Sequence, residues 1–213
     1  MASLPSSWRK GFLRRIGDRQ IEDVEPDQIR GCLRFTISKQ LGALRRRSGE
    51  TQTDFWVRQN EAFGRAVTAL DWGMADTVYA FNGCALEAFR EARRRGLCCV
   101  LDQTAAPWRY NTALLGREQE RWPGWESQPA DLDVGGWMID REEEEWALAD
   151  RIVCGSRFVV DAIEAVGGPV KKSTVVAYPV PPPLPAPLPR TRDGRTRVLF
   201  VGTLQLRKGI QYF

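Results

Sequence analysis

Two basic residues near the end of the sequence are arranged as in a phosphate-binding turn. The stretch FVGTLQLRKGI, residues 200–210, predicts a buried strand, a turn at Gly202 and Thr203, and the start of a helix that carries Arg207 and Lys208. A glycine lets the backbone approach a ligand, and basic side chains near the first N–H groups of a helix can hold a phosphate or diphosphate. A plain strand–turn–helix with basic surface residues explains the spacing equally well. The sequence contains neither GxGxxG nor GxxxxGK[ST], so no dinucleotide or P-loop fingerprint supports the site.

A second set of candidates follows three of the predicted strands, where short polar or small residues interrupt the apolar pattern. We expect these residues to line a cleft: Asn82 and Gly83, Gln103 and Thr104, and Ser156. Ser156 is also well placed to cap the helix predicted for residues 157–166.

The composition excludes several kinds of chemistry. The chain has 213 residues and no histidine, which excludes a Ser-His-Asp or Cys-His nucleophile, an HExxH zinc site and a histidine base for the chain acting alone. The five cysteines are odd in number and include no CxxC pair, which favours buried free thiols over disulfides or a zinc site. Proton transfer would have to use carboxylates, Lys, Tyr, Cys or the substrate.

The net charge of +4 is modest. The triplets Arg45–Arg47 and Arg93–Arg95 could contact a polyanion, but each closes a helix-like segment shortly before a glycine. A basic helix C-terminus, which the helix dipole favours, is the better interpretation. We therefore expect no nucleic-acid partner.

Four glutamates, Glu142–Glu145, open the helix predicted for residues 140–149. In a first turn they would stabilise the helix dipole from solvent, and we prefer this interpretation to paired catalytic carboxylates, since four in a row cannot share one face. Four tryptophans nearby could stack on a sugar or an apolar acceptor, although packing is expected for most of them: Trp108, Trp122, Trp125 and Trp137.

Short apolar strands alternate with amphipathic helices from residue 76 onward. The pattern predicts strands at 76–81, 97–101, 151–154 and 174–178, with helices at 84–95, 111–121, 140–149 and 157–166. This alternation predicts an α/β fold, a Rossmann-like parallel sheet with helices on both faces. Before residue 74 the pattern is polar and helical, with one weak strand candidate at 33–38.

Three segments follow from this pattern. Residues 1–178 are predicted to form a Rossmann-like N-terminal domain, for which no first strand is evident. Residues 179–195 form a Pro-rich connector, with seven of the thirteen prolines in residues 179–189, and an interdomain linker is favoured over a ligand for an SH3-type domain. Residues 196–213 are expected to begin a second, truncated Rossmann-like domain, because a strand isolated after a linker cannot bury both faces.

Three stretches together resemble the nucleotide-sugar glycosyltransferases of family 4, which have the GT-B fold. They are EEEEWALADRIVCGSRFVVDAI (142–163), STVVAYPV (173–180) and FVGTLQLRKGIQYF (200–213). Their order fits the end of the N-terminal domain, the interdomain connector and the first strand and helix of the C-terminal, nucleotide-sugar-binding domain. The strand–turn–helix from Asp76 and the stretch LCCVLD also look similar to the middle of the N-terminal domain.

The resemblance implies that Lys208 and Arg207, with Gly202 and Thr203 in the turn before them, bind the donor diphosphate. Family members commonly have a basic residue directly after the glycine, whereas this chain has Thr203 there. The role of Lys208 therefore carries over, and a basic role at Thr203 does not.

Other family features are absent from this sequence. The Gly-rich loop has no counterpart before Asp76, and Gln103 or Thr104 stands at about the place of the frequent active-site histidine. The acidic EX7E-type motif would lie beyond Phe213. We therefore expect this chain to be an inactive fragment when it is alone.

The resemblance implies a full-length enzyme that transfers a sugar, with retention, from a nucleotide-diphosphate donor to an unidentified glycan, lipid or small molecule. No metal or other cofactor is expected. The alternative is a non-enzymatic α/β binding module whose Pro-rich segment docks to a partner. No apolar run reaches the roughly 20 residues that span a bilayer, so a cytoplasmic protein is expected, with peripheral membrane association left open.

Overall fold

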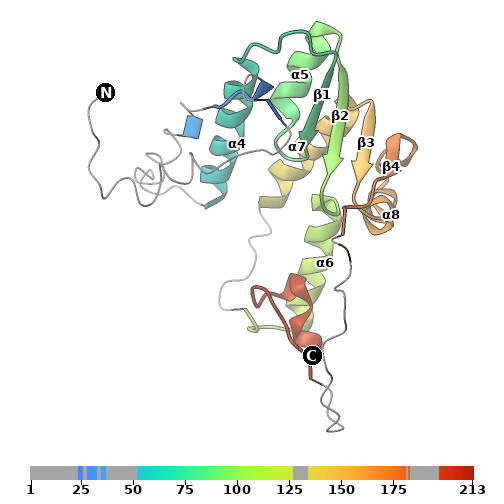
Figure 1. Ribbon diagram of the computed structural model, residues 1–213. Helices are drawn as coiled ribbons and strands as arrows, with labels where there is room; N and C mark the ends of the chain where they lie inside the picture. The colour runs from blue at the N-terminus through green and yellow to red at the C-terminus, as the bar shows by residue number, and fades with distance from the viewer. Residues whose placement is uncertain are drawn as a thin grey trace.

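Four parallel strands form one sheet, which lies in the upper part of Figure 1. The computed structural model describes residues 24–25, 28–32, 35–36, 52–126, 134–180, 182 and 197–213. The predicted α/β class with a Rossmann-like parallel sheet is confirmed. Each strand pairs with the next one in chain order: β1 (Thr77–Phe81), β2 (Cys98–Gln103), β3 (Arg151–Cys154) and β4 (Ser173–Val175).

Helices connect and flank the strands. α4 precedes β1, α5 connects β1 to β2, α6 and α7 lie between β2 and β3, and α8 and a 3-10 turn lead to β4. None of the described helices is long and apolar enough to cross a membrane. Their bounds are α4 (Gln52–Thr68), α5 (Leu86–Arg95), α6 (Trp108–Arg121), α7 (Val134–Leu148), α8 (Arg157–Ala165), η2 (Val170–Lys172), η3 (Leu206–Lys208) and η4 (Ile210–Tyr212).

The core fills one face of the sheet. Leu101 of β2 and its register partner Ile152 of β3 are fully buried among side chains of α5, α7 and α8. Crossovers between parallel strands are right-handed, so strands that lie in chain order place all their crossover helices on the same side. One buried cluster accordingly includes Phe89 of α5, Trp146 of α7 and Ile163 of α8.

The opposite face is exposed at β1. Tyr79 and Phe81 are 55% and 57% exposed, whereas the alternating residues Val78 and Ala80 pack against the core. Helices were expected on both faces of the sheet. Among the described residues, the crossover helices α5, α7 and α8 share one face, and the second face carries no such helix.

The end of α5 follows the sequence pattern closely. Gly96 adopts the left-handed conformation with φ 72°, which glycine does without the steric cost that a side chain would add. Arg93–Arg95 occupy the last turn, as expected from the helix dipole, while Arg45–Arg47 lie outside the described residues. Each arginine of the α5 triplet pairs with a carboxylate, Arg93 with Asp150 and the other two with Glu91.

Two predicted strands are not seen. Phe35 and Thr36 are helical, and the other residues of the 33–38 candidate lie outside the described residues. Residues 197–201 pair with none of the four described strands, and Leu199 and Val201 are 87% and 85% exposed. A strand needs a neighbour to satisfy its N–H and C=O groups. The second domain therefore remains a prediction.

Candidate functional site

The residues predicted to line a cleft gather at the carboxyl ends of the strands. Asn82 and Gly83 follow β1, Gln103 ends β2, Thr104 follows it, and Ser156 lies just after β3. Because the strands are parallel, these ends share one edge of the sheet, which is where ligands bind in open α/β folds. We call these five residues the sheet-edge site.

One buried carboxylate joins the residues of the sheet-edge site that follow β1 and β2. Glu142 of α7 is 1% exposed. Its Oε1 accepts hydrogen bonds from Asn82 Nδ2 at 3.1 Å and Gln103 Nε2 at 2.7 Å, and its Oε2 accepts from the backbone N–H of Trp108 at 2.8 Å. One side chain therefore ties together the β1 loop, the end of β2 and the start of α6. Burial raises the pKa of the Glu142 carboxyl against the opposing effect of these hydrogen bonds.

Further hydrogen bonds extend from this carboxylate to the surface. Asn82 Oδ1 accepts from the backbone N–H of Thr104 at 3.2 Å and from its hydroxyl at 2.9 Å. Gln103 Oε1 accepts from the indole Nε1 of Trp146 at 2.9 Å. We call Asn82, Gln103, Thr104, Glu142 and Trp146 the Glu142 network, and Thr104 is its exposed member.

A second buried carboxylate occupies the N-terminus of α5. Glu145 is fully buried and accepts hydrogen bonds from the backbone N–H groups of Gly83 at 2.7 Å, Ala85 at 2.9 Å and Leu86 at 3.1 Å. These N–H groups have no intrahelical partners, and such a helix end attracts anions. Burial raises the pKa of Glu145 to about 7, although the three amides and Arg141 act in the opposite direction. The first strand–helix turn of the sheet is thus closed by a carboxylate of the chain itself.

Arg141 supplies the balancing positive charge. It is 4% exposed and donates from Nε to the carbonyl oxygen of Gly83 at 2.8 Å. Both its terminal nitrogens bond the Glu87 carboxylate, and its Nε lies 3.6 Å from Glu145 Oε1. The guanidinium also lies 5.3 Å from the centre of the Trp137 ring. Trp137 is therefore a packing residue, as expected for most of the tryptophans.

The prediction of a solvated first turn at Glu142–Glu145 is wrong. α7 begins at Val134, so the four glutamates lie in its middle. Glu142 and Glu145 face the core, while Glu143 and Glu144 are partly or fully exposed and pair with Arg109 and Arg90. A helical stripe in the sequence could have revealed the buried pair, since apolar and glutamate residues recur at spacings of three and four: Met138, Glu142, Glu145, Trp146 and Ala149.

Ser156 lies at the same edge but outside the Glu142 network. It is exposed at the N-cap of α8, and its side chain makes no capping hydrogen bond. Gly155 before it lies against the ring of Tyr178, where an added Cβ would come within 2.4 Å of a ring carbon. Phe158 in the first turn of α8 is 56% exposed and meets the Tyr110 ring edge-on, with 6.0 Å between ring centres. Aromatic rings thus flank the polar edge.

The predicted diphosphate-binding residues lie elsewhere. Arg207 and Lys208 are exposed in η3, and Gly202 and Thr203 are exposed before it. This end of the chain packs on the far end of α6 (Figure 1), where the hydroxyl of Tyr212 donates to Glu118 at 2.7 Å. α6 has 14 residues, or roughly 20 Å of helix, and its first turn lies at the sheet edge. The structure therefore does not bring the two predicted sets together.

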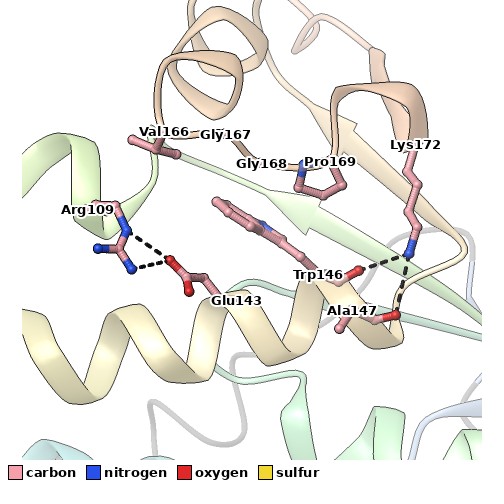
Figure 2. A pocket seen from close by; sticks show the side chains of 9 residues that line it. All are labelled: Arg109, Glu143, Trp146, Ala147, Val166, Gly167, Gly168, Pro169 and Lys172. Carbon is pink, nitrogen blue, oxygen red and sulfur yellow. Dashed lines mark hydrogen bonds and ion pairs between the residues drawn. The ribbon is translucent and has the colours of Figure 1, made fainter.

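A hollow of about 620 Å³ opens between α7 and the segment that follows α8 (Figure 2). Its charged side chains are engaged within the protein. Arg109 pairs with Glu143 at 2.6 Å, and Lys172 Nζ donates to the carbonyl oxygens of Trp146 at 3.2 Å and Ala149 at 2.8 Å. We interpret this hollow as a space that remains between two packed elements.

The five cysteines are free thiols, as predicted, but Cys32, Cys84 and Cys98 are only partly buried. Cys99 and Cys154 are buried, and burial raises the pKa of both, that of Cys154 to about 11. These two thiols therefore stay protonated near neutral pH. Within the described part of the chain, no group of three or more Cys, Asp or Glu residues could hold a metal ion.

No protein-family model matches the chain, and no curated protein matches it either.

Proposed function

We propose that the chain is the acceptor-side part of a glycosyltransferase that uses a nucleotide-diphosphate sugar. The observation that supports this proposal best is the convergence of Asn82, Thr104 and Ser156 at the carboxyl edge of a parallel sheet. This edge is where Rossmann-like domains bind small polar ligands. The resemblance of residues 142–163, 173–180 and 200–213 to family 4 enzymes points to the same reaction.

The sheet-edge site offers the groups that an acceptor sugar or alcohol needs. Thr104 and Ser156 present exposed hydroxyls, and the Glu142 network holds the former in place. The exposed rings of Phe158 and Tyr178 flank the edge, and aromatic faces pack well on the apolar faces of sugars. Holding the acceptor in a reactive orientation is itself a large part of catalysis in such a transfer.

Lys208 and Arg207 are the groups proposed to bind the donor. Lys208 has no carboxylate partner among the described residues, and Arg207 bonds only the amide oxygen of Gln205 there. A cation at this turn would stabilise the charge that develops on the departing diphosphate. Because η3 lies at the far end of α6, transfer requires this segment to approach the sheet edge.

The reaction exchanges one C–O bond for another. The bond between the anomeric carbon and the diphosphate oxygen breaks, and a bond from that carbon to the acceptor oxygen forms. The acceptor proton passes to the departing diphosphate oxygen, so that the charges balance in a single exchange. The protein's part is to orient the two substrates and to stabilise the leaving group.

The test is a transfer assay on the gene product that contains this chain. UDP-, GDP- and ADP-sugars are incubated with a panel of sugar and alcohol acceptors, and products are identified by mass spectrometry. Lys208→Ala should abolish product formation, while Lys171→Ala, a matched change in the exposed residue of η2, should leave it unchanged. If no donor is bound or consumed, or if Lys208→Ala transfers normally, the proposal fails and the binding module replaces it.

A further inference from the structure

We infer that the sheet-edge site at β1 and β2 binds a neutral sugar ring, through a ligand hydroxyl that donates a hydrogen bond to Thr104 Oγ1. This inference rests on the proposed function and makes it more specific, because it excludes a phosphate group as the ligand at this position. The hydrogen bonds of the Glu142 network have a fixed direction from the core to the surface.

In the core, the direction of the hydrogen bonds is set by groups that can only donate. The indole N–H of Trp146 donates to Gln103 Oε1, so the amide nitrogen of Gln103 must face Glu142, as the 2.7 Å contact shows. The backbone N–H of Trp108 donates to the other oxygen of the same carboxylate. Neither an indole nor a backbone N–H can accept a hydrogen bond. Glu142 is therefore fixed as an acceptor.

The orientation of the Asn82 amide follows from both of its neighbours. On one side its nitrogen donates to Glu142 Oε1 at 3.1 Å. On the other side its oxygen accepts from the backbone N–H of Thr104 at 3.2 Å. A flipped amide would place its nitrogen against that N–H and its oxygen against the carboxylate, leaving both contacts repulsive. Only one orientation of Asn82 satisfies the site.

The orientation of Asn82 in turn fixes the direction of the Thr104 hydroxyl. Its only proton is directed at Asn82 Oδ1, 2.9 Å away. A hydroxyl carries one donor and two acceptor lone pairs, so Thr104, which is exposed, offers only lone pairs to a ligand. A sugar hydroxyl can donate to them, whereas an ionised phosphate has no proton to give.

A second pair on the same two strands has the same polarity. The hydroxyl of Tyr79 donates to Asp102 Oδ2 at 2.7 Å, and the carboxylate can only accept. Arginines in the first turns of α6 and α8 could attract an anion, but each is paired with a carboxylate, Arg109 with Glu143 and Arg157 with Asp161. The hydrogen-bonding groups and the local charge at β1 and β2 thus both disfavour a phosphate.

The same residues favour a neutral ligand over a cation. The carboxylates of Glu142 and Asp102 are on residues only 1% and 6% exposed, and both accept hydrogen bonds within the protein. Phe81, at the end of β1 and next to Asn82, is 57% exposed. An exposed aromatic ring beside a hydrogen-bond acceptor suits a sugar, which has an apolar C–H face and hydroxyls at its rim.

The experiment measures binding without transfer, so it stands apart from the assay of the proposed function. Saturation-transfer NMR on the full chain uses methyl glucoside, methyl galactoside and methyl mannoside as probes, with inorganic phosphate and spermidine for comparison. At least one glycoside should bind. Thr104→Val should weaken its binding about threefold to tenfold, the usual effect of one neutral hydrogen bond, while Thr104→Ser should retain it. Thr174→Val, an exposed change in β4, is the matched control.

A double-mutant cycle tests whether Glu142 affects ligand binding through Thr104. Glu142→Gln gives Asn82 an amide neighbour that can both donate and accept, so the fixed direction of the Thr104 hydroxyl is lost. It should weaken glycoside binding in the wild-type background and have no further effect in the Thr104→Val background, with folding checked by circular dichroism. If Glu142→Gln does not fold, the comparison of Thr104→Val with Thr104→Ser decides alone.

The inference is overturned if none of the three glycosides binds, whether or not phosphate or spermidine does, or if Thr104→Val binds glycosides as the wild type does. If the transfer assay fails but glycosides bind in a way that depends on Thr104, the transferase is refuted and the sugar site stands. If the wild type transfers sugar normally and Thr104→Val does not change this activity, the sugar site is refuted and the transferase stands.

Discussion

At the scale of single residues, the two buried glutamates of α7 shape the sheet edge in different ways. Glu142 joins side chains and one backbone N–H around β1 and β2, whereas Glu145 satisfies only backbone N–H groups at the start of α5. A buried carboxylate is costly unless hydrogen bonds compensate for lost hydration. The compensating donors belong to the loops that carry the site, so each carboxylate also fixes the site's shape.

Removing the Glu145 carboxylate should strongly destabilise the fold. Glu145→Ala leaves three buried N–H groups without their acceptor and removes the carboxylate that lies 3.6 Å from Arg141, which we expect to cost about 3 kcal/mol in the free energy of unfolding. Glu144→Ala, at the adjacent position but exposed and paired with Arg90, should cost less than about 1 kcal/mol. Urea unfolding at neutral pH gives both values, and equal losses for the two variants would contradict the account.

The same side chain should give the fold a particular pH dependence. Its pKa is about 7 in the folded protein against 4.5 for an ordinary glutamate, so between these values the folded chain keeps a proton that the unfolded chain has lost. Stability from this group is complete below pH 4.5 and falls as the pH rises to about 7. Relative to Glu145→Gln, the wild type should lose unfolding free energy between pH 5 and pH 8. A difference that stays constant or grows with pH would show that the three amides outweigh burial.

At the scale of elements, α5 and α8 lie close to the segments that the sequence predicts, and α7 begins earlier. Both helices could be predicted from the sequence, because α5 and α8 have periodic apolar residues and a glycine follows each of them. The start of α7 could not be predicted, because Gly135 and Gly136 disfavour a helix on intrinsic propensity. The helix nevertheless includes them, and in the next turn Met138 is buried and Trp137 contacts Arg141. This earlier start is the reason why Glu142–Glu145 do not lie in the first turn of the helix, where the sequence predicts them.

The end of α7 depends on a lysine that is distant in the sequence. Lys172 Nζ donates to carbonyl oxygens at the helix end, which have no intrahelical partners. Lys172→Met keeps the aliphatic chain and removes the charge, and it should lower the free energy of unfolding by about 1 kcal/mol. Lys171→Met, the exposed neighbour, should change it by less than about 0.5 kcal/mol. Thermal and urea unfolding check the pair, and a loss of the same size at Lys171 would exclude the capping role.

At the scale of the whole molecule, the order of the strands explains which parts of the site were predictable. Strand–helix alternation places the carboxyl ends of β1, β2 and β3 together, so Asn82, Thr104 and Ser156 could be grouped from the sequence alone. Lys208 could not be placed, because its position depends on contacts of Tyr212 with α6 that no periodicity records. Winding in a single direction also places the described crossover helices on the sheet face opposite Tyr79, which local patterns do not reveal.

If ligands bind at the carboxyl edge of the sheet, amide chemical-shift mapping should locate them there. The ¹⁵N-labelled chain is titrated with methyl glucoside, methyl galactoside and methyl mannoside, and shifts are assigned residue by residue. The largest changes should occur at the amides of Asn82, Gly83 and Thr104. Changes confined to the hollow at Lys172, or to η3, would contradict binding at this edge.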